Sequence, residues 1–126
     1  MAGEKINGNV TLEELIKSFI LLHVGSGKTI PSVERTDVIF YAKRCLQEFN
    51  YETYYTQEGF TVPADANPTT DTVVPKLAED YLHTAIAYYI LSDKQNANPN
   101  ILQKLIAEKT EKLRQAKSRL VFTNFN

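Results

Sequence analysis

A glycine-rich segment, Gly25-Ser-Gly-Lys-Thr29, matches the last part of a phosphate-binding P-loop. The complete motif needs a glycine six residues before the lysine, and that position is Leu22. The motif also follows a strand, whereas the residues before Gly25 have the apolar spacing of a helix, and Pro31 follows closely. We therefore predict a glycine turn between two helices, with Lys28 in solvent, and no nucleotide site.

A carboxylate and an imidazole share one helical face in Glu79-x-x-x-His83 and in Asp80-x-x-His83. Di-iron helical bundles use Glu-x-x-His from each of two helices, together with further glutamates. Only half of such a motif is present here, with Asp in place of Glu, and His23 has no carboxylate at helical spacing before it. The sequence therefore predicts no metal site and no cofactor, with His83 a hydrogen-bonded histidine at the edge of the core.

Cys45 is the single cysteine of the chain, so no internal disulfide is expected. A nucleophilic cysteine needs a positioned histidine base and an orienting group. Cys45 instead lies on the apolar face of its expected helix, as core cysteines do. With no nucleophile–base pair and no metal pattern, we expect no catalytic residues and a protein that is not an enzyme. An enzyme with an unrecognised site is the minor alternative.

Basic side chains mark the outer face of the last expected helix. They are Lys104, Lys109, Lys112, Arg114, Lys117 and Arg119. Such a stripe can contact phosphates or an acidic partner, with Lys112, Arg114 and Lys117 as candidate contacts, or it can be a solvated face. The net charge of −1 gives no general argument for nucleic-acid binding. The alternative function is therefore a small helical nucleic-acid-binding module that uses this helix.

The spacing of apolar residues predicts a mainly α fold of about four helices in one domain, residues 1–126. The helices, packed around a central apolar helix, are expected at 12–23, 32–50, 75–94 and 99–120. The first begins with a capping box, in which Thr11 and Glu14 each satisfy the other's backbone N–H group. Pro75 and Pro99 suit the first turn of a helix, where a missing N–H costs nothing.

Three segments are expected to lie outside these helices. Residues 1–9 are polar and should form a flexible arm, and residues 121–126 should form an apolar C-terminal tail. Residues 51–74 are expected to form a small β-hairpin or a long loop, because the start of this stretch is rich in aromatic and β-branched residues. A hairpin of this size is marginal alone, so it should pack on the helices or on another chain.

The stretch Tyr81–Leu91 contains no glycine, no proline and no formal charge. A helix here is apolar on nearly every side, so it must be buried all round, either inside its own fold or between subunits. It is too short to cross a bilayer, which needs about 20 apolar residues. Because a chain of this size has few elements to wrap a helix, we expect neighbouring subunits to supply part of the covering.

Aromatic residues gather in two further places, the expected hairpin and the tail. In the hairpin they are Tyr51, Tyr54, Tyr55 and Phe60, and in the tail Phe122 and Phe125. Tyrosine offers a large contact area and is enriched at protein interfaces. We therefore expect partner contacts at both places. Packing within the chain is the alternative for the tyrosines, and a disordered terminus is the alternative for the tail.

The order of these elements resembles the small head-to-tail connector proteins, also called adaptor or neck proteins, of tailed bacteriophages. Two stretches carry the resemblance. The first is Arg35–Tyr51, which leads into the expected hairpin, and the second is Leu77–Leu91, which is followed by Asn98-Pro99 and the last helix. The likeness covers most of the chain in its layout and includes no catalytic signature.

The resemblance implies a non-enzymatic virion structural protein that forms a dodecameric ring. The ring would join the portal protein to the tail and extend the channel through which double-stranded DNA passes without sequence-specific binding. The portal-docking residues would then be Leu120, Val121, Phe122 and Phe125. The contacts within the ring or with neighbouring tail proteins would be Tyr51, Tyr54, Tyr55 and Phe60.

The same resemblance implies a location in the virion, at the neck between capsid and tail, for a protein made in the host cytoplasm with no membrane contact. Channels of this kind tend to be lined by acidic residues, whereas this sequence contains no acidic run. The sequence therefore does not indicate which face would line the channel.

Overall fold

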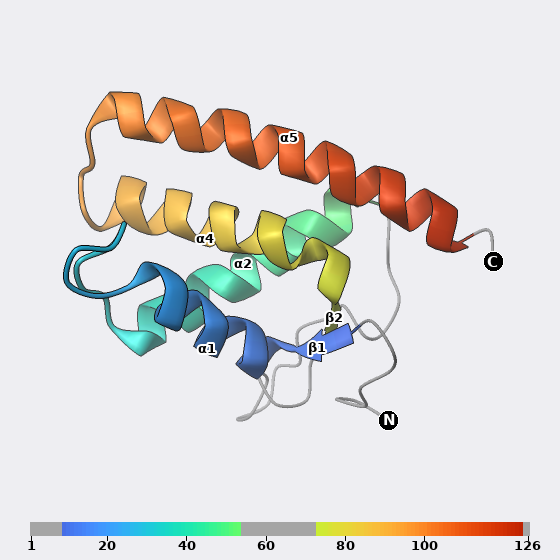
Figure 1. The fold of residues 1–126 in the computed structure, drawn as a ribbon, viewed down its shortest axis with the longest axis horizontal. Helices are drawn as coiled ribbons and strands as arrows, with labels where there is room; N and C mark the ends of the chain where they lie inside the picture. Colours follow the sequence, from blue (N-terminus) through green and yellow to red (C-terminus); the bar gives the residue numbers. More distant parts are fainter. Residues whose placement is uncertain (1–8, 54–72, 125–126) are drawn as a thin grey trace.

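The fold is mainly α, as the sequence predicts. The computed structural model describes residues 9–53 and 73–124, and four α-helices account for most of them (Figure 1). The elements are β1 (Asn9–Thr11), α1 (Leu12–His23), α2 (Arg35–Thr53), β2 (Val73–Pro75), the 3₁₀-helix η2 (Lys76–Ala78), α4 (Glu79–Asp93) and α5 (Pro99–Asn124). Among these residues, no helix combines the length and the apolar character that crossing a membrane requires.

Helix α1 has the predicted bounds because its start signal is local. The Thr11 Oγ1 accepts the backbone N–H of Glu14 at 3.1 Å, and the Glu14 carboxylate accepts the backbone N–H of Thr11 at 3.0 Å. This reciprocal capping box satisfies two of the four N–H groups that a helix leaves free at its start. The apolar stripe then buries four side chains in the core, Leu12, Leu15, Ile16 and Phe19.

A short two-stranded sheet precedes α1. Strands β1 and β2 pair antiparallel, with Val10 opposite Val74. The prediction of a flexible arm is therefore wrong for Asn9, which belongs to β1, and residues 1–8 lie outside the described residues. The prediction that residues 73–74 belong to a local hairpin or loop is also wrong. Their strand pairs with a segment far away in the sequence, which a hairpin pattern does not reveal.

Helix α2 is displaced by three residues from its expected range, because it begins at Arg35 and ends at Thr53. The segment before it contains an isolated bridge between Val24 and Ile30, in which the backbone N–H of Ile30 donates to the His23 carbonyl at 2.9 Å, and the first helical hydrogen bond is accepted by the Glu34 carbonyl. Helix α2 ends late because Tyr51 continues the helix, so the hairpin prediction is wrong for residues 51–53. Strand propensity is a weak guide where packing favours the helix. Residues 54–72 lie outside the described residues.

The boundaries of the last two helices also differ from the prediction. Pro75 lies in β2, and the third expected helix begins as the 3₁₀ turn η2 before α4 starts at Glu79. Helix α5 does not end at residue 120 but continues to Asn124, so the expected tail is helical over 121–124. No glycine or proline interrupts this stretch, and helices usually need such a signal to end.

Helix α4 lies at the centre of the molecule, between α5 on one side and α1 and α2 on the other (Figure 1). Every residue of Tyr81–Ala87 is buried within this single chain, as are Ile90 and Leu91. This chain alone therefore covers those nine residues, whereas Tyr88 and Tyr89 are half-buried, and the expected contribution of neighbouring subunits stays a prediction. Three helices bury these residues, because α1, α2 and α5 each direct an apolar face toward α4.

Helix α5 is the longest and least buried helix. Its 26 residues span about 39 Å, whereas the 15 residues of α4 span about 22 Å, at the 1.5 Å rise of an α-helix. It lies along α4, and its C-terminal end extends beyond the rest of the helical body (Figure 1). Among its described side chains, Ala116 alone is fully buried. Helix α5 therefore packs on the body along one face only.

Candidate functional site

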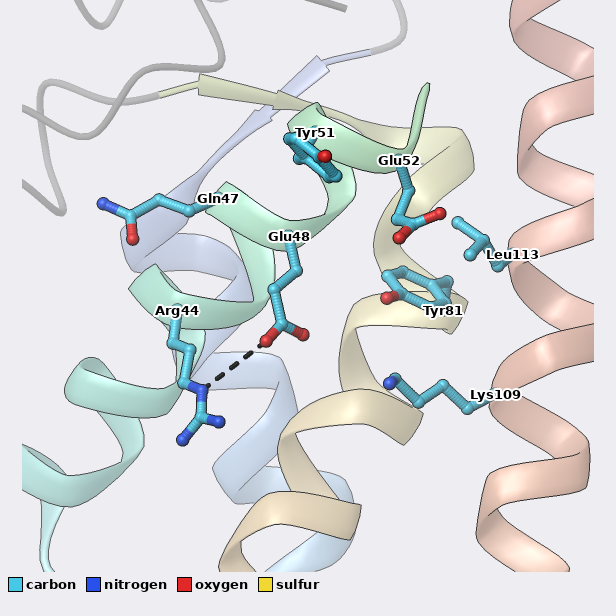
Figure 2. A pocket seen from close by; sticks show the side chains of 8 residues that line it. All are labelled: Arg44, Gln47, Glu48, Tyr51, Glu52, Tyr81, Lys109 and Leu113. Carbon is cyan, nitrogen blue, oxygen red and sulfur yellow. Dashed lines mark ion pairs between the residues drawn. The ribbon is translucent and has the colours of Figure 1, made fainter. Parts of the chain in front are cut away.

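An open groove with a volume of about 650 Å³ lies between α2 and α5. We call it the α2–α5 groove. It is lined by Arg44, Gln47, Glu48, Tyr51 and Glu52 of α2, Tyr81 of α4, and Lys109 and Leu113 of α5. Figure 2 shows α2 and α5 on its two sides, with Tyr81 at its base. The groove exists because α2 and α5 both pack on α4 and stay apart from each other.

The base of the groove is apolar. The Tyr81 ring is buried and packs on Phe49 of α2, with 5.6 Å between ring centroids. Burial raises the pKa of the Tyr81 hydroxyl, so this group stays neutral. Leu113 is half-buried beside it. This surface suits an aromatic or aliphatic side chain.

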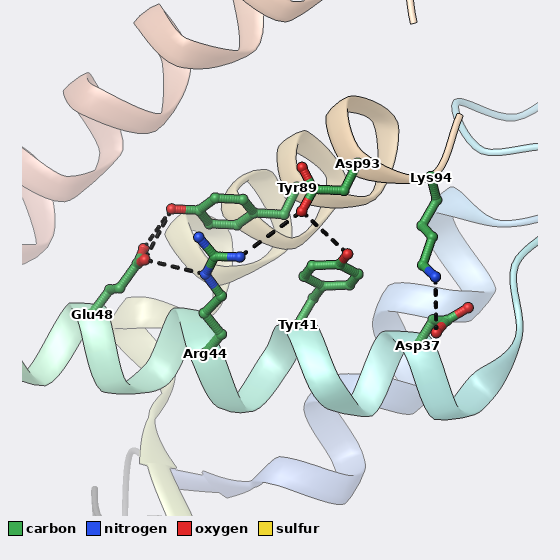
Figure 3. A network of polar contacts seen from close by, with 7 residues as sticks. All are labelled: Asp37, Tyr41, Arg44, Glu48, Tyr89, Asp93 and Lys94. Atoms are coloured by element: carbon green, nitrogen blue, oxygen red, sulfur yellow. Dashed lines mark hydrogen bonds and ion pairs between the residues drawn. The ribbon is translucent and has the colours of Figure 1, made fainter. Parts of the chain in front are cut away.

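The α2 wall of the groove is fixed by Tyr89 of α4, as Figure 3 shows. The Tyr89 hydroxyl donates to the Glu48 carboxylate at 2.7 Å, and the Arg44 guanidinium lies 4.4 Å above the centroid of the Tyr89 ring. Arg44 Nε also pairs with Glu48 at 3.5 Å. Burial and the Glu48 carboxylate both raise the pKa of Tyr89. Arg44 and Glu48 are therefore held in place by one ring.

The same network continues along the seam between α2 and α4 (Figure 3). Asp93 accepts a hydrogen bond from the buried Tyr41 hydroxyl at 3.2 Å and lies 3.9 Å from an Arg44 nitrogen. Burial raises the pKa of Tyr41, and the negative charge of Asp93 raises it further. Lys94 pairs with Asp37 at 3.8 Å. These groups tie α2 and α4 together. Arg44 and Glu48 also line the groove.

Lys109 is the exception to this pairing. Its amine lies 5.3 Å and 5.8 Å from the ring centroids of Tyr89 and Tyr88, a cation–π arrangement. It forms no ion pair with any residue of 9–53 or 73–124. The groove therefore contains one cation whose charge no described carboxylate balances.

The three basic residues predicted to contact phosphates or an acidic partner are all paired within the chain. Lys112 donates to Thr84 Oγ1 at 2.8 Å and lies 3.1 Å from an Asp80 oxygen. Arg114 binds Glu111 at 2.5 Å and lowers the pKa of that carboxyl. Lys117 lies 3.8 Å from a Glu52 oxygen. Lys112 in particular anchors α5 to α4, which is a structural role.

His83 is buried and hydrogen-bonded, as predicted for a histidine at the edge of the core. Its Nε2 lies 3.0 Å from the Ser18 Oγ, and that hydroxyl donates its proton to the Leu15 carbonyl at 2.9 Å. The residues described contain no cluster of three or more ligating side chains that could hold a metal ion.

His83 also packs against the second histidine, His23, a contact that the sequence did not suggest. The His23 and His83 rings meet edge to face, with 5.3 Å between centroids, and Phe19 packs on both. Burial lowers the pKa of His83 to about 4, and the neighbouring His23 adds to the effect. Burial likewise lowers the pKa of His23, and the positive charge of Lys112 lowers it further. Both rings are therefore neutral at neutral pH.

The remaining candidates for chemistry have structural positions. Cys45 is buried in the core, where burial raises the pKa of its thiol. The glycine-rich segment is a turn, as predicted, with Gly25 and Gly27 at positive φ angles of 138° and 79°. Lys28 is exposed, and it donates a hydrogen bond to the Leu21 carbonyl at the end of α1. It therefore satisfies a carbonyl that the helix leaves free.

The residues expected at interfaces are only partly described. Tyr51 lies on the rim of the groove and is 78% exposed. Leu120, Val121 and Phe122 belong to the helical end of α5, but their side chains lie outside the described residues. Tyr54, Tyr55, Phe60 and Phe125 also lie outside the described residues. The structure thus places one predicted contact residue, Tyr51, in the α2–α5 groove.

Sequence reasoning missed the groove and most of its lining. The spacing of Arg44 and Glu48 is the usual spacing of a helical ion pair, and this was the one signal available for them. The contributions of Tyr81 and Lys109 depend on how three helices meet, which no local pattern contains. Comparison of the chain with protein-family models, with curated proteins and with solved structures finds no match.

Proposed function

We propose that this protein is a non-enzymatic head-to-tail connector of a tailed-bacteriophage virion. In this role it forms a ring that joins the portal protein to the tail and extends the DNA channel. The observation that carries the proposal is the long helix α5, whose C-terminal end extends beyond the helical body (Figure 1). That end bears the apolar sequence Leu120-Val-Phe122.

A projecting helical end of this composition is suited to docking on a partner. An isolated short helix is marginal in water, so a projecting end gains stability when a partner surface covers it. Apolar residues in such a position bind through a groove of the partner, with contacts three and four residues apart. The portal protein is the partner that the connector role requires.

Exposed apolar side chains elsewhere support contacts with more than one neighbour. Leu21 and Leu22 at the end of α1 are 70% and 60% exposed, and Phe40 and Tyr51 are exposed along α2. Tyrosine and phenylalanine are enriched at interfaces. A ring subunit needs two different contact faces, because each copy meets the next one head to tail. The two helices offer such faces.

The alternative, a nucleic-acid-binding module that uses α5, has less support. Its three candidate contacts, Lys112, Arg114 and Lys117, are already paired with carboxylates of this chain. Releasing Lys112 would also cost its hydrogen bond to Thr84. If this reading is right, binding to double-stranded DNA falls steeply as salt increases and is lost on charge reversal at these three positions.

The connector proposal is tested by co-purification with the portal protein encoded in the same genome. We expect the full chain to bind the portal, and deletion of residues 121–126 to abolish binding. Phe122→Ser should weaken binding strongly, whereas Ser118→Ala, an exposed change one helical turn earlier, should leave it unchanged. Equal portal binding by the full chain and the deletion variant, or no binding by either, contradicts the proposal.

A further inference from the structure

We propose that the α2–α5 groove is a docking site for a segment of a partner protein that carries an aromatic or aliphatic side chain next to a carboxylate. The apolar side chain would lie against Leu113 and the exposed ring of Tyr51, and the carboxylate would pair with Lys109. This site is separate from the end of α5, and the inference does not depend on the connector function.

The shape of the groove fits a side chain presented by a protein segment. Its volume of about 650 Å³ is within the usual range of binding pockets, and it is open along one side between α2 and α5 (Figure 2). The base is apolar, because the Tyr81 ring is buried and Leu113 lies beside it. The rim holds the exposed ring of Tyr51, which can close over an incoming side chain. Aromatic residues placed this way are typical of interface anchors.

The charges in the groove select a carboxylate. Arg44 is balanced by Glu48 and Asp93, and Glu52 is balanced by Lys117. Lys109 remains, and within the described part of the chain it contacts aromatic rings and no carboxylate. Figure 2 shows its amine directed into the groove. These six side chains sum to no net charge, so the local feature is that the Lys109 amine has no ion-pair partner of its own among the described residues. A partner carboxylate would give it one, whereas a partner cation would face Lys109 and Arg44 together.

The groove is also prepared for binding before a partner arrives. Tyr89 holds Glu48 through a hydrogen bond of 2.7 Å and holds Arg44 through its ring, so the α2 wall loses little freedom on binding (Figure 3). Preorganised walls lower the entropic cost of association. Glu48 pairs with Arg44 and accepts from Tyr89, and among the described residues it forms no ion pair with Lys109.

The test uses two capped peptides as probes, Ac-Ser-Glu-Phe-Leu-Ser-NH₂ and the same peptide with Gln in place of Glu. Binding to the full-length protein is followed by the shifts of backbone amide signals in two-dimensional NMR. We expect the Glu peptide to shift amides of the groove-lining residues and to bind about threefold more tightly than the Gln peptide, the size expected of a half-exposed ion pair.

Variants separate the charge from the shape. With Lys109→Gln, the two peptides should bind equally, because the preference for Glu arises at this amine. With Lys104→Gln, an exposed change on the same helix outside the groove, the preference for Glu should remain. Tyr51→Ala should weaken both peptides alike and should not disturb folding, since this side chain is exposed.

Three results would overturn the proposal. The first is the absence of shifts at the groove with either peptide, and the second is a shift pattern centred elsewhere on the protein. The third is a preference for the Glu peptide that persists in Lys109→Gln. Loss of portal binding on deleting residues 121–126 bears on the connector function alone, so the two proposals fail separately.

Discussion

Acidification should destabilise this protein through His83, and the size of the effect follows from its burial. The ring is 7% exposed, and its pKa in the folded state is about 4, compared with 6.5 for an ordinary histidine. Because the folded-state pKa is the lower one, the unfolded chain takes up the proton first as the pH falls. The stabilising contribution of neutral His83 is therefore complete above pH 6.5, decreases between pH 6.5 and 4, and is lost below pH 4.

The magnitude comes from the difference between the two pKa values. A gap of about 2.5 pH units, at 1.36 kcal/mol per unit, corresponds to about 3.4 kcal/mol of unfolding free energy when the titration is complete. Between pH 7 and pH 4.5 the expected loss is about 2.5 kcal/mol, which is most of this total. This is a large fraction of the stability of a small domain, which is about 5 to 15 kcal/mol.

The assay is urea denaturation at pH 7 and pH 4.5 for the parent chain and for His83→Gln. Carboxylates also titrate in this range, so the informative quantity is the difference between the two proteins. The Gln side-chain amide can donate or accept a hydrogen bond at the Ser18 hydroxyl, but it takes up no proton. The parent chain should lose about 2.5 kcal/mol more than the variant. Equal losses, or an NMR titration that places the pKa of His83 near 6.5, would refute the reasoning.

Three further predictions concern the core and the start of α1. Thr11→Ala removes one half of the capping box and should lower the unfolding free energy by about 1 kcal/mol, measured by urea denaturation. An unchanged midpoint would show that the cap contributes nothing. Ile86→Ala leaves a cavity beside fully buried neighbours and should cost about 2 to 5 kcal/mol in the same assay, with a loss below 1 kcal/mol arguing against full burial. Cys45 should react with a thiol reagent only after unfolding, because it is buried and its pKa is raised, so fast labelling of the folded protein would contradict its position.

The parts of the fold that could be predicted depend on short-range signals. The bounds of α1 follow from the capping box at Thr11 and from an apolar stripe that repeats with the helical period. The burial of α4 follows from an uncharged apolar run, although its covering by this chain alone does not. The burial of α4 within this chain depends on how much of its surface α1, α2 and α5 contact. That contact follows from the tertiary packing and is not contained in the local sequence pattern.

The errors arose where a distant segment decides the local structure. Asn9 and Val73 lie in strands because each segment pairs with the other. Each strand has three residues, which is too short for an alternating pattern to be recognised in the sequence. Tyr51 is helical because α2 continues past its expected end, against the strand preference of an aromatic residue. The strands depend on a tertiary contact, whereas the Tyr51 side chain is 78% exposed and its residue is helical as a continuation of α2.

The candidate site could not be predicted for a related reason. Its base and walls come from three helices, and its distinguishing feature is that Lys109 has no carboxylate beside it among the described residues. From sequence alone, Lys109 is one of six similar basic residues on α5. Its difference from Lys112 becomes visible only when the partners of each amine are known.

The measurement that tests the central claim most directly is the mass of the complex formed by this protein and the portal protein of the same genome, determined by native mass spectrometry. The connector account predicts a closed assembly with many copies of this chain on one portal ring, even if the isolated chain is a monomer. A monomer under every condition, with no complex on mixing or co-expression, would contradict the account.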